Sequence, residues 1–191
     1  AVIRKAFNMA AVGDIRNRLM SLADQSIQGN PEIYTLFGNR LSKEKTQDQL
    51  LAELKSMVNG KHPLVRSIPD PMRKIIRNHF YIFLKKMDPD FDLRGASIGN
   101  LILTGGYLDN KRHLDPVIFI FSKLVLVRGT VRPVVNRYLH LVAEMEDGEV
   151  IVGQHKMTGK EADPLSSKIR KLHSCFLMPV KTGFLNEVWK P

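Results

Sequence analysis

The spacing of apolar residues predicts four helices in the first half of the chain. Apolar positions recur there every three or four residues, the spacing that gives a helix one apolar face. The first helix opens at Gly13-Asp14, where Asp14 suits the N-cap and the positive end of the helix dipole. The second helix begins after Pro31. The third ends before Gly60, and the fourth runs over residues 72–87.

The second half begins with a change of pattern. Residues 91–94 read as a short strand that enters a glycine-containing turn, and a helix is predicted to begin at Ser97. A further helix is expected to be capped at Asp115-Pro116, because apolar residues follow at helical spacing. This order of strand, turn and helix is typical of an α/β protein.

A β-hairpin is predicted further along the chain. Apolar residues alternate over 139–145, Asp147-Gly148 suits a two-residue turn, and 150–152 is the returning strand. No period persists after Ser174, so no element is predicted there. The mixture indicates a sheet with helices packed on its faces. Since no linker rich in Gly, Ser or Pro interrupts the 191 residues, a single domain is expected.

The chain carries a formal net charge of +10, which predicts an anionic partner. Residues 61–86 hold seven Lys or Arg against the single Asp70, and residues 111–138 hold six against the single Asp115. Nucleic acid, an acidic membrane surface or a phosphorylated small molecule would each suit this charge. The alternative for each cluster is a helix face that is simply solvated.

Other features of the sequence bear on the cellular setting. No apolar run approaches the ~20 residues of a membrane span, so no membrane-spanning segment is expected, and a membrane is not among the partners that we favour. The first five residues do not continue into the apolar core of a signal peptide. The lone Cys175 excludes an internal disulfide and a multi-cysteine zinc site, which fits a cytoplasmic protein.

The turn around Ser97 is a candidate phosphate site. A glycine-containing turn into a helix leaves backbone N–H groups unpaired beside the positive end of the dipole, an arrangement that attracts phosphate. Gly95 and Gly99 would let a phosphate approach the backbone, while Ser97, Asn100 and Arg94 could add side-chain hydrogen bonds. The alternative is an ordinary serine N-cap followed by a glycine that serves packing.

The segment 13–17 is a second candidate. It places Asp14, Arg16 and Asn17 within one helical turn, so a carboxylate, a guanidinium and an amide could meet a phosphate–metal complex together. Asp14 suits Mg²⁺, which takes oxygen ligands and usually keeps waters and phosphates. The alternative is a capped helix with Arg16 in solvent.

A third candidate is the stretch that contains Arg128 and Arg132 and is followed by Asn136. These side chains flank a short extended segment that could line a cleft. The alternative is that they are edge-strand charges, which discourage aggregation.

Four blocks in this order, over residues 10–160, resemble the CofD-like family. The family contains 2-phospho-L-lactate transferase and the gluconeogenesis-factor-like proteins. The blocks are Gly-Asp-Ile-Arg-Asn at 13–17, Arg-Gly-Ala-Ser-Ile-Gly-Asn-Leu at 94–101, Val-Arg-Gly-Thr-Val-Arg-Pro at 127–133 and Leu-Val-Ala-Glu-Met-Glu-Asp-Gly at 141–148.

The resemblance implies an α/β fold, a Rossmann-like three-layer sandwich with extra helices in the first half and a β-hairpin in the second. It implies binding of a nucleoside diphosphate derivative, GDP- or UDP-linked, with Mg²⁺ as cofactor of the transferase members. The matched motifs imply that Arg94, Ser97, Gly99 and Asn100 bind the phosphates. They imply that Arg16, Asn17 and Asn136 bind the substrate, and that Asp14 serves catalysis and holds the metal.

The resemblance leaves the activity open between two branches of the family. Transferase members move a phospholactyl-type group from a guanosine diphosphate donor to a small-molecule acceptor, so that an acceptor hydroxyl attacks phosphorus and a nucleoside monophosphate leaves. The gluconeogenesis-factor branch binds UDP-sugars and is regulatory, and the block at 94–101 looks closer to that branch. The transferase precedent favours an enzyme, and a nucleic-acid-binding protein is the least favoured reading.

The family pattern also includes segments that this sequence lacks. These are a Gly-rich first strand and turn, an Asp-Asp-Gly-Gly type segment, and a Gly-Pro-Gly-Ser-like turn near the end. We therefore expect residues 1–191 to be an incomplete single CofD-like domain. The sequence leaves open whether the protein forms a homo-oligomer.

Overall fold

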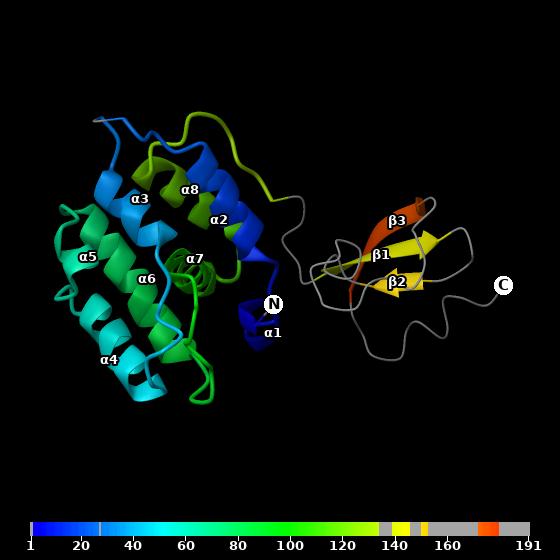
Figure 1. Cartoon of the computed structure of the whole chain (residues 1–191). Coiled ribbons are helices and arrows are strands. Elements are labelled where there is room, and N and C mark those ends of the chain that lie inside the picture. The colour runs from blue at the N-terminus through cyan, green and yellow to red at the C-terminus, as the bar shows by residue number, and fades with distance from the viewer. Residues whose placement is uncertain (1, 27, 134–138, 146–149, 153–171, 180–191) are drawn as a thin grey trace. The chain divides into compact units, whose positions relative to one another are not determined.

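The computed structural model describes residues 2–26, 28–133, 139–145, 150–152 and 172–179, in two compact units, Ala1–Asn136 and Arg137–Pro191 (Figure 1). The described part of the first unit is helical. Its helices are α1 (Val2–Ala6), α2 (Val12–Ser21), α3 (Pro31–Gly38), α4 (Gln47–Val58), α5 (Pro63–Arg66), α6 (Met72–Lys86), α7 (Ile98–Asp109) and α8 (Leu114–Leu124). That both units belong to a single CofD-like domain stays a prediction.

The four helices predicted in the first half are confirmed as α2, α3, α4 and α6, but two predicted caps are wrong. Ala11 is the N-cap of α2, and Asp14 lies exposed in its first turn. His113 is the N-cap of α8, and Asp115 lies in its first turn. Each carboxylate thus stays near the positive end of its helix dipole, which is favourable without a capping bond.

The central helix of the first unit is α7, which is buried on nearly every side and confirms the helix predicted after Ser97. Helices α2, α3, α6 and α8 all pack against it (Figure 1). The approach of α6 depends on Gly105, since a Cβ there would lie 1.9 Å from the carbonyl oxygen of His79. Gly106 is confined less tightly and by side chains, because its Cβ would lie 2.8 Å from His79 Cε1 and 3.0 Å from Val117 Cγ1.

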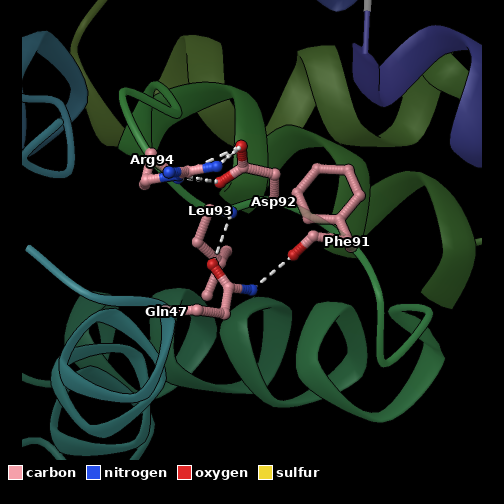
Figure 2. A network of polar contacts seen from close by, with 5 residues as sticks. All are labelled: Gln47, Phe91, Asp92, Leu93 and Arg94. Atoms are coloured by element: carbon pink, nitrogen blue, oxygen red, sulfur yellow. Dashed lines mark hydrogen bonds and ion pairs between the residues drawn. The ribbon is translucent and has the colours of Figure 1, made fainter.

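The strand predicted at residues 91–94 is wrong, because this segment forms a loop held by a side chain. Phe91 and Leu93 are buried, but their backbone groups bond to Gln47 at the start of α4 (Figure 2). Gln47 Nε2 donates to the Phe91 carbonyl at 2.5 Å, and the Leu93 N–H donates to Gln47 Oε1 at 3.1 Å. One amide therefore satisfies the backbone where a neighbouring strand would otherwise be needed.

The second unit contains a three-stranded antiparallel sheet in the order β2-β1-β3. Its strands are β1 (Leu139–Met145), β2 (Val150–Val152) and β3 (Leu172–Pro179). The predicted hairpin is confirmed as β1 and β2. The third strand was not predicted, because Leu-His-Ser-Cys-Phe-Leu-Met-Pro lacks the period of two that marks a half-buried strand.

The register of the hairpin differs by one residue from the register that a two-residue turn would give. Glu144 pairs with Val150, whereas a two-residue turn at 147–148 would pair Met145 with that position. The predicted turn residues themselves lie outside the described residues.

The described elements confirm only part of the predicted fold class. Helices and a β-hairpin are both present, but the described residues are mainly helical and contain no parallel strand pair. In the described part of the chain, no helix combines the length and the apolar character that crossing a membrane requires.

Protonation of His79 gives a testable pH dependence of stability. Burial lowers the pKa of His79 below 6.5, and the carboxylate of Asp109 partly opposes this. As the pH falls below 6.5, the unfolded chain binds a proton that the native state does not. The free energy of unfolding should therefore decrease, by at most about 1.4 kcal/mol per pH unit, until the native pKa is reached.

The measurement is urea denaturation between pH 7.5 and 5.0 of the wild type and of His79→Gln. The difference between the two free-energy curves gives the contribution of His79, because the other titrating groups contribute to both proteins. Parallel curves would show that His79 does not supply the effect.

Candidate functional site

The first turns of α2 and α7 lie against each other and form the base of the candidate site. A Cβ on Gly13 in α2 would lie 3.9 Å from Nδ2 of Asn100 in α7. A Cβ on Gly99 would lie 2.9 Å from Cδ of Arg16 and 2.8 Å from the carbonyl oxygen of Phe37. Gly99 is therefore required for packing, because only a residue without a Cβ lets the Arg16 side chain cross the start of α7.

Ser97 occupies the N-cap of α7 and is 2% exposed, but its side chain makes no capping bond. Its hydroxyl instead accepts a hydrogen bond from Arg16 Nη1. The Ile98 N–H donates to the Asn39 carbonyl at 3.0 Å. Among the described residues, no acceptor pairs with the N–H groups of Gly99 and Asn100. The start of α7 thus keeps two unpaired donors at its positive end.

The connection between α3 and α4 brings a second arginine to this point. Leu41 N–H donates to the Ala96 carbonyl at 2.9 Å, and Arg40 and Ser97 form an antiparallel backbone bridge. Arg40 Nη1 donates to the Gly95 carbonyl at 3.0 Å, which holds its exposed side chain near the turn. Gly95 has φ +67°, the left-handed conformation that glycine adopts at no steric cost.

The two arginines repel one another at the start of α7. Partial burial lowers the pKa of Arg16, and the nearby charge of Arg40 adds to this. Both guanidiniums stay charged, since arginine does not lose its proton in proteins. Neither forms an ion pair with a carboxylate in the described part of the chain. Two cations and two free backbone donors are suited to bind a phosphate-like anion.

Two amide side chains complete this cluster. Asn17 Oδ1 accepts from Arg16 Nη2 at 2.7 Å and so helps to orient the guanidinium. Asn100 Oδ1 is buried and has no donor among the described residues. The Asn100 carbonyl accepts from the Thr104 hydroxyl at 2.7 Å, inside α7.

The structure brings most of the predicted site residues together. Those that converge at the start of α7 are Arg16, Asn17, Ser97, Gly99 and Asn100. Their roles in binding stay predictions.

For three predicted site residues, the described part of the chain shows no side-chain contact with this cluster. Asp14 is exposed in the first turn of α2 and shares that turn with Gly13. The Arg94 guanidinium is ion-paired with Asp92 at 2.9 Å and is 58% exposed (Figure 2). Asn136 lies outside the described residues. The assignments of these three residues remain predictions.

Arg40 was missed by the sequence reasoning. It lies in a loop without a periodic pattern, 57 positions before Ser97, and only the backbone bridge brings the two together. Its place directly after a predicted helix was the only available signal.

The predicted Mg²⁺ site can be compared with the metal-binding side chains among the described residues. No cluster of three or more His, Cys, Asp or Glu side chains that could hold a metal occurs among the described residues. Asp14 offers one exposed carboxylate. Mg²⁺ is often bound by one or two carboxylates together with ligand phosphates, so the donor set fits only when a phosphorylated ligand is present.

The third candidate segment lines a cleft of about 440 Å³ beside α8. Gly129, Thr130, Val131 and Arg132 contribute to its wall, and the segment forms no strand, so the edge-strand alternative is wrong. Arg128 instead pairs with Asp24 at 2.9 Å.

This ion pair is part of a small network that fixes the segment. Hydrogen bonds from Ser26 and then from Arg128 lower the pKa of Asp24 to about 2. The Asp24 N–H donates to the Val125 carbonyl at 3.1 Å, which ties the end of α2 to the end of α8.

Comparison with known proteins places this geometry in a wider context. The family described as 2-phospho-L-lactate transferase CofD matches residues 1–188. Proteins named gluconeogenesis factor are similar: the Listeria monocytogenes protein is 38% identical over 38% of this chain and 22% of its own length. The Bacillus subtilis protein is 30% identical over 54% of this chain and 36% of its own length.

A solved structure supports the fold. A UPF0052-family protein from Bacillus halodurans superposes with a TM-score of 0.54 and 24% identity, covering 93% of this chain and 38% of the other. The chain thus spans between about a fifth and two fifths of the length of these relatives.

Proposed function

Because this chain belongs to the CofD family, we propose that it binds a nucleoside diphosphate derivative at the start of α7. The observation that carries the proposal is the convergence of Arg16, Ser97 and the N–H groups of Gly99 and Asn100, which have no acceptor among the described residues. Arg16 and Ser97 come from different family blocks and lie 81 positions apart in sequence. A helix N-terminus with an adjacent guanidinium is a common way to hold phosphate.

In this proposal the cluster has a defined division of roles. The N–H groups of Gly99 and Asn100 and the Arg16 guanidinium hold a phosphate. Asn17 orients Arg16, as its 2.7 Å hydrogen bond indicates. Arg94 would join only after leaving Asp92, and Asn136 is proposed to face the acceptor. The Rossmann-like three-layer sandwich is likewise proposed for the intact protein.

The proposed activity is either phosphoryl-linked group transfer or regulation. In a transferase, Mg²⁺ would be held by Asp14 and the ligand phosphates and would neutralise the charge that develops when the diphosphate bond breaks. The protein would contribute mainly by positioning the donor and by charge stabilisation. The similarity to proteins named gluconeogenesis factor favours the second candidate, a regulator that binds a UDP-sugar without turnover.

Ligand binding should stabilise the intact protein. GDP, UDP or a UDP-sugar at about 100 times its dissociation constant should raise the free energy of unfolding by roughly 2.7 kcal/mol. Asn100→Leu or Ser97→Ala should weaken binding by about 1–3 kcal/mol, because each removes a polar group of the site. Calorimetric titration well below the melting transition measures this.

The control is Ser42→Ala, which changes a partly exposed loop serine whose hydroxyl accepts a hydrogen bond from the Glu44 N–H. Its affinity should equal that of the wild type. If no ligand of the panel stabilises the wild type at millimolar concentration, the proposed function is wrong.

A further inference from the structure

Two guanidiniums share the start of α7, and only one of them belongs to a family block recognised in the sequence. Arg16 reaches Ser97 across Gly99, so its charge lies at the first turn of α7. Arg40 is held by the Gly95 carbonyl on the loop that pairs with Ser97. The two charges are close enough for Arg40 to lower the pKa of Arg16. Like charges brought together without a carboxylate partner are unfavourable unless an anion joins them.

A second observation concerns a polar side chain of the same turn. The side-chain oxygen of Asn100 is buried without a donor in the described part of the chain. A buried acceptor without a partner is costly, so such atoms are usually paired with a donor such as water. A phosphate oxygen also accepts, so the partner of this oxygen would be a water or a hydroxyl of the ligand and not the phosphate itself. This oxygen belongs to the first turn of α7, where the N–H groups of Gly99 and Asn100 also have no acceptor among the described residues.

Arg40 and Arg16 differ in solvent exposure and in the groups that hold their side chains. Arg16 is partly buried and fixed by Ser97 and Asn17. Arg40 is exposed and held through one backbone carbonyl, so the rest of its guanidinium remains available. Arg94, by contrast, is engaged by Asp92 through several hydrogen bonds.

We propose that Arg40 is a second phosphate-binding residue, which contacts the outer phosphate of a diphosphate whose inner phosphate lies on Arg16 and the start of α7. This inference rests on the proposed function and makes it more specific. It implies that the site prefers diphosphates to monophosphates, because only a diphosphate can meet both guanidiniums.

The test compares diphosphate and monophosphate ligands in pairs. The pairs are inorganic pyrophosphate with orthophosphate, UDP with UMP, and GDP with GMP, each titrated calorimetrically into the intact protein. The wild type should bind the diphosphate at least about tenfold more tightly, the effect of one charge-assisted contact. Arg40→Met should bring this ratio close to one while leaving the monophosphate affinity within about threefold.

Two further variants separate binding from folding. Arg40→Lys keeps the charge and should restore part of the preference. Arg73→Met removes a partly exposed arginine of α6 that pairs with Asp70, and it should keep the full preference. Wild-type binding with an unchanged ratio in folded Arg40→Met would overturn the inference but not the proposed function. Absence of binding by all six ligands would overturn both.

Discussion

Replacing Gly105 with alanine is expected to lower the free energy of unfolding by about 3 kcal/mol. The new Cβ would lie 1.9 Å from the carbonyl oxygen of His79 and 2.7 Å from its carbonyl carbon. Both are backbone atoms of α6, so no side-chain rotation can relieve the contact. Helices α6 and α7 would have to separate, and α7 is the centre of the first unit. Urea denaturation with fixed slope measures the change.

The matched control for Gly105→Ala is Gly13→Ala. Gly13 also lies in a helix, but its Cβ would meet nothing closer than 3.9 Å. Because alanine favours helix more than glycine does, this change should be neutral or stabilising by up to about 1 kcal/mol. A loss below 1 kcal/mol for Gly105→Ala would contradict the close packing of α6 and α7.

Replacing Asp14 with asparagine is expected to separate an enzyme from a regulator. If the protein is a transferase, turnover of a nucleoside diphosphate donor should fall by about 10²–10³, as when one electrostatic stabiliser of a transition state is removed. Nucleotide affinity should stay within about tenfold, because Asp14 is proposed to act through Mg²⁺ on the breaking bond and not on the ground state. Release of the nucleoside monophosphate from a labelled donor is the measurement.

Asp48→Asn is the control for this experiment. Asp48 is also an exposed carboxylate in the first turn of a helix, α4, so its removal has the same effect on a helix dipole. Its turnover should equal that of the wild type. Wild-type protein that binds nucleotide tightly yet releases no monophosphate with Mg²⁺ and a range of acceptors would identify the regulator instead.

The sequence predicted the amphipathic helices well because their burial is one-sided. In α6, Ile76, Phe80 and Phe83 are buried at helical spacing, and the opposite face is polar. The packing of α7 was not foreseeable in this way, because Gly105 and Gly106 are buried by contact with one histidine far away in sequence. Local pattern indicates that a helix exists but not which neighbour requires its glycines.

Two features that local sequence did not indicate have a common physical cause. Phe91 and Leu93 alternate as in a strand, yet the hydrogen bonds of their backbone are made by Gln47. Similarly, Arg94 lies next to Gly95 in sequence but pairs with Asp92, whereas Arg40 is far away in sequence and donates a hydrogen bond to the Gly95 carbonyl. In both cases a hydrogen bond between residues far apart in sequence fixes the local arrangement. Such a bond produces no periodic pattern in the sequence.

The position of α7 links ligand occupancy to the slowest motions of the helical unit. Its first turn carries the free N–H groups, and its later turns are buried among α2, α3, α6 and α8. Amide protons of Leu103 and Tyr107 should therefore exchange with solvent only when the whole unit opens. A nucleotide bound at the start of the helix would slow their hydrogen exchange as much as it raises global stability, although it touches neither residue. Exchange rates deep in the core would thus report on a ligand at the surface.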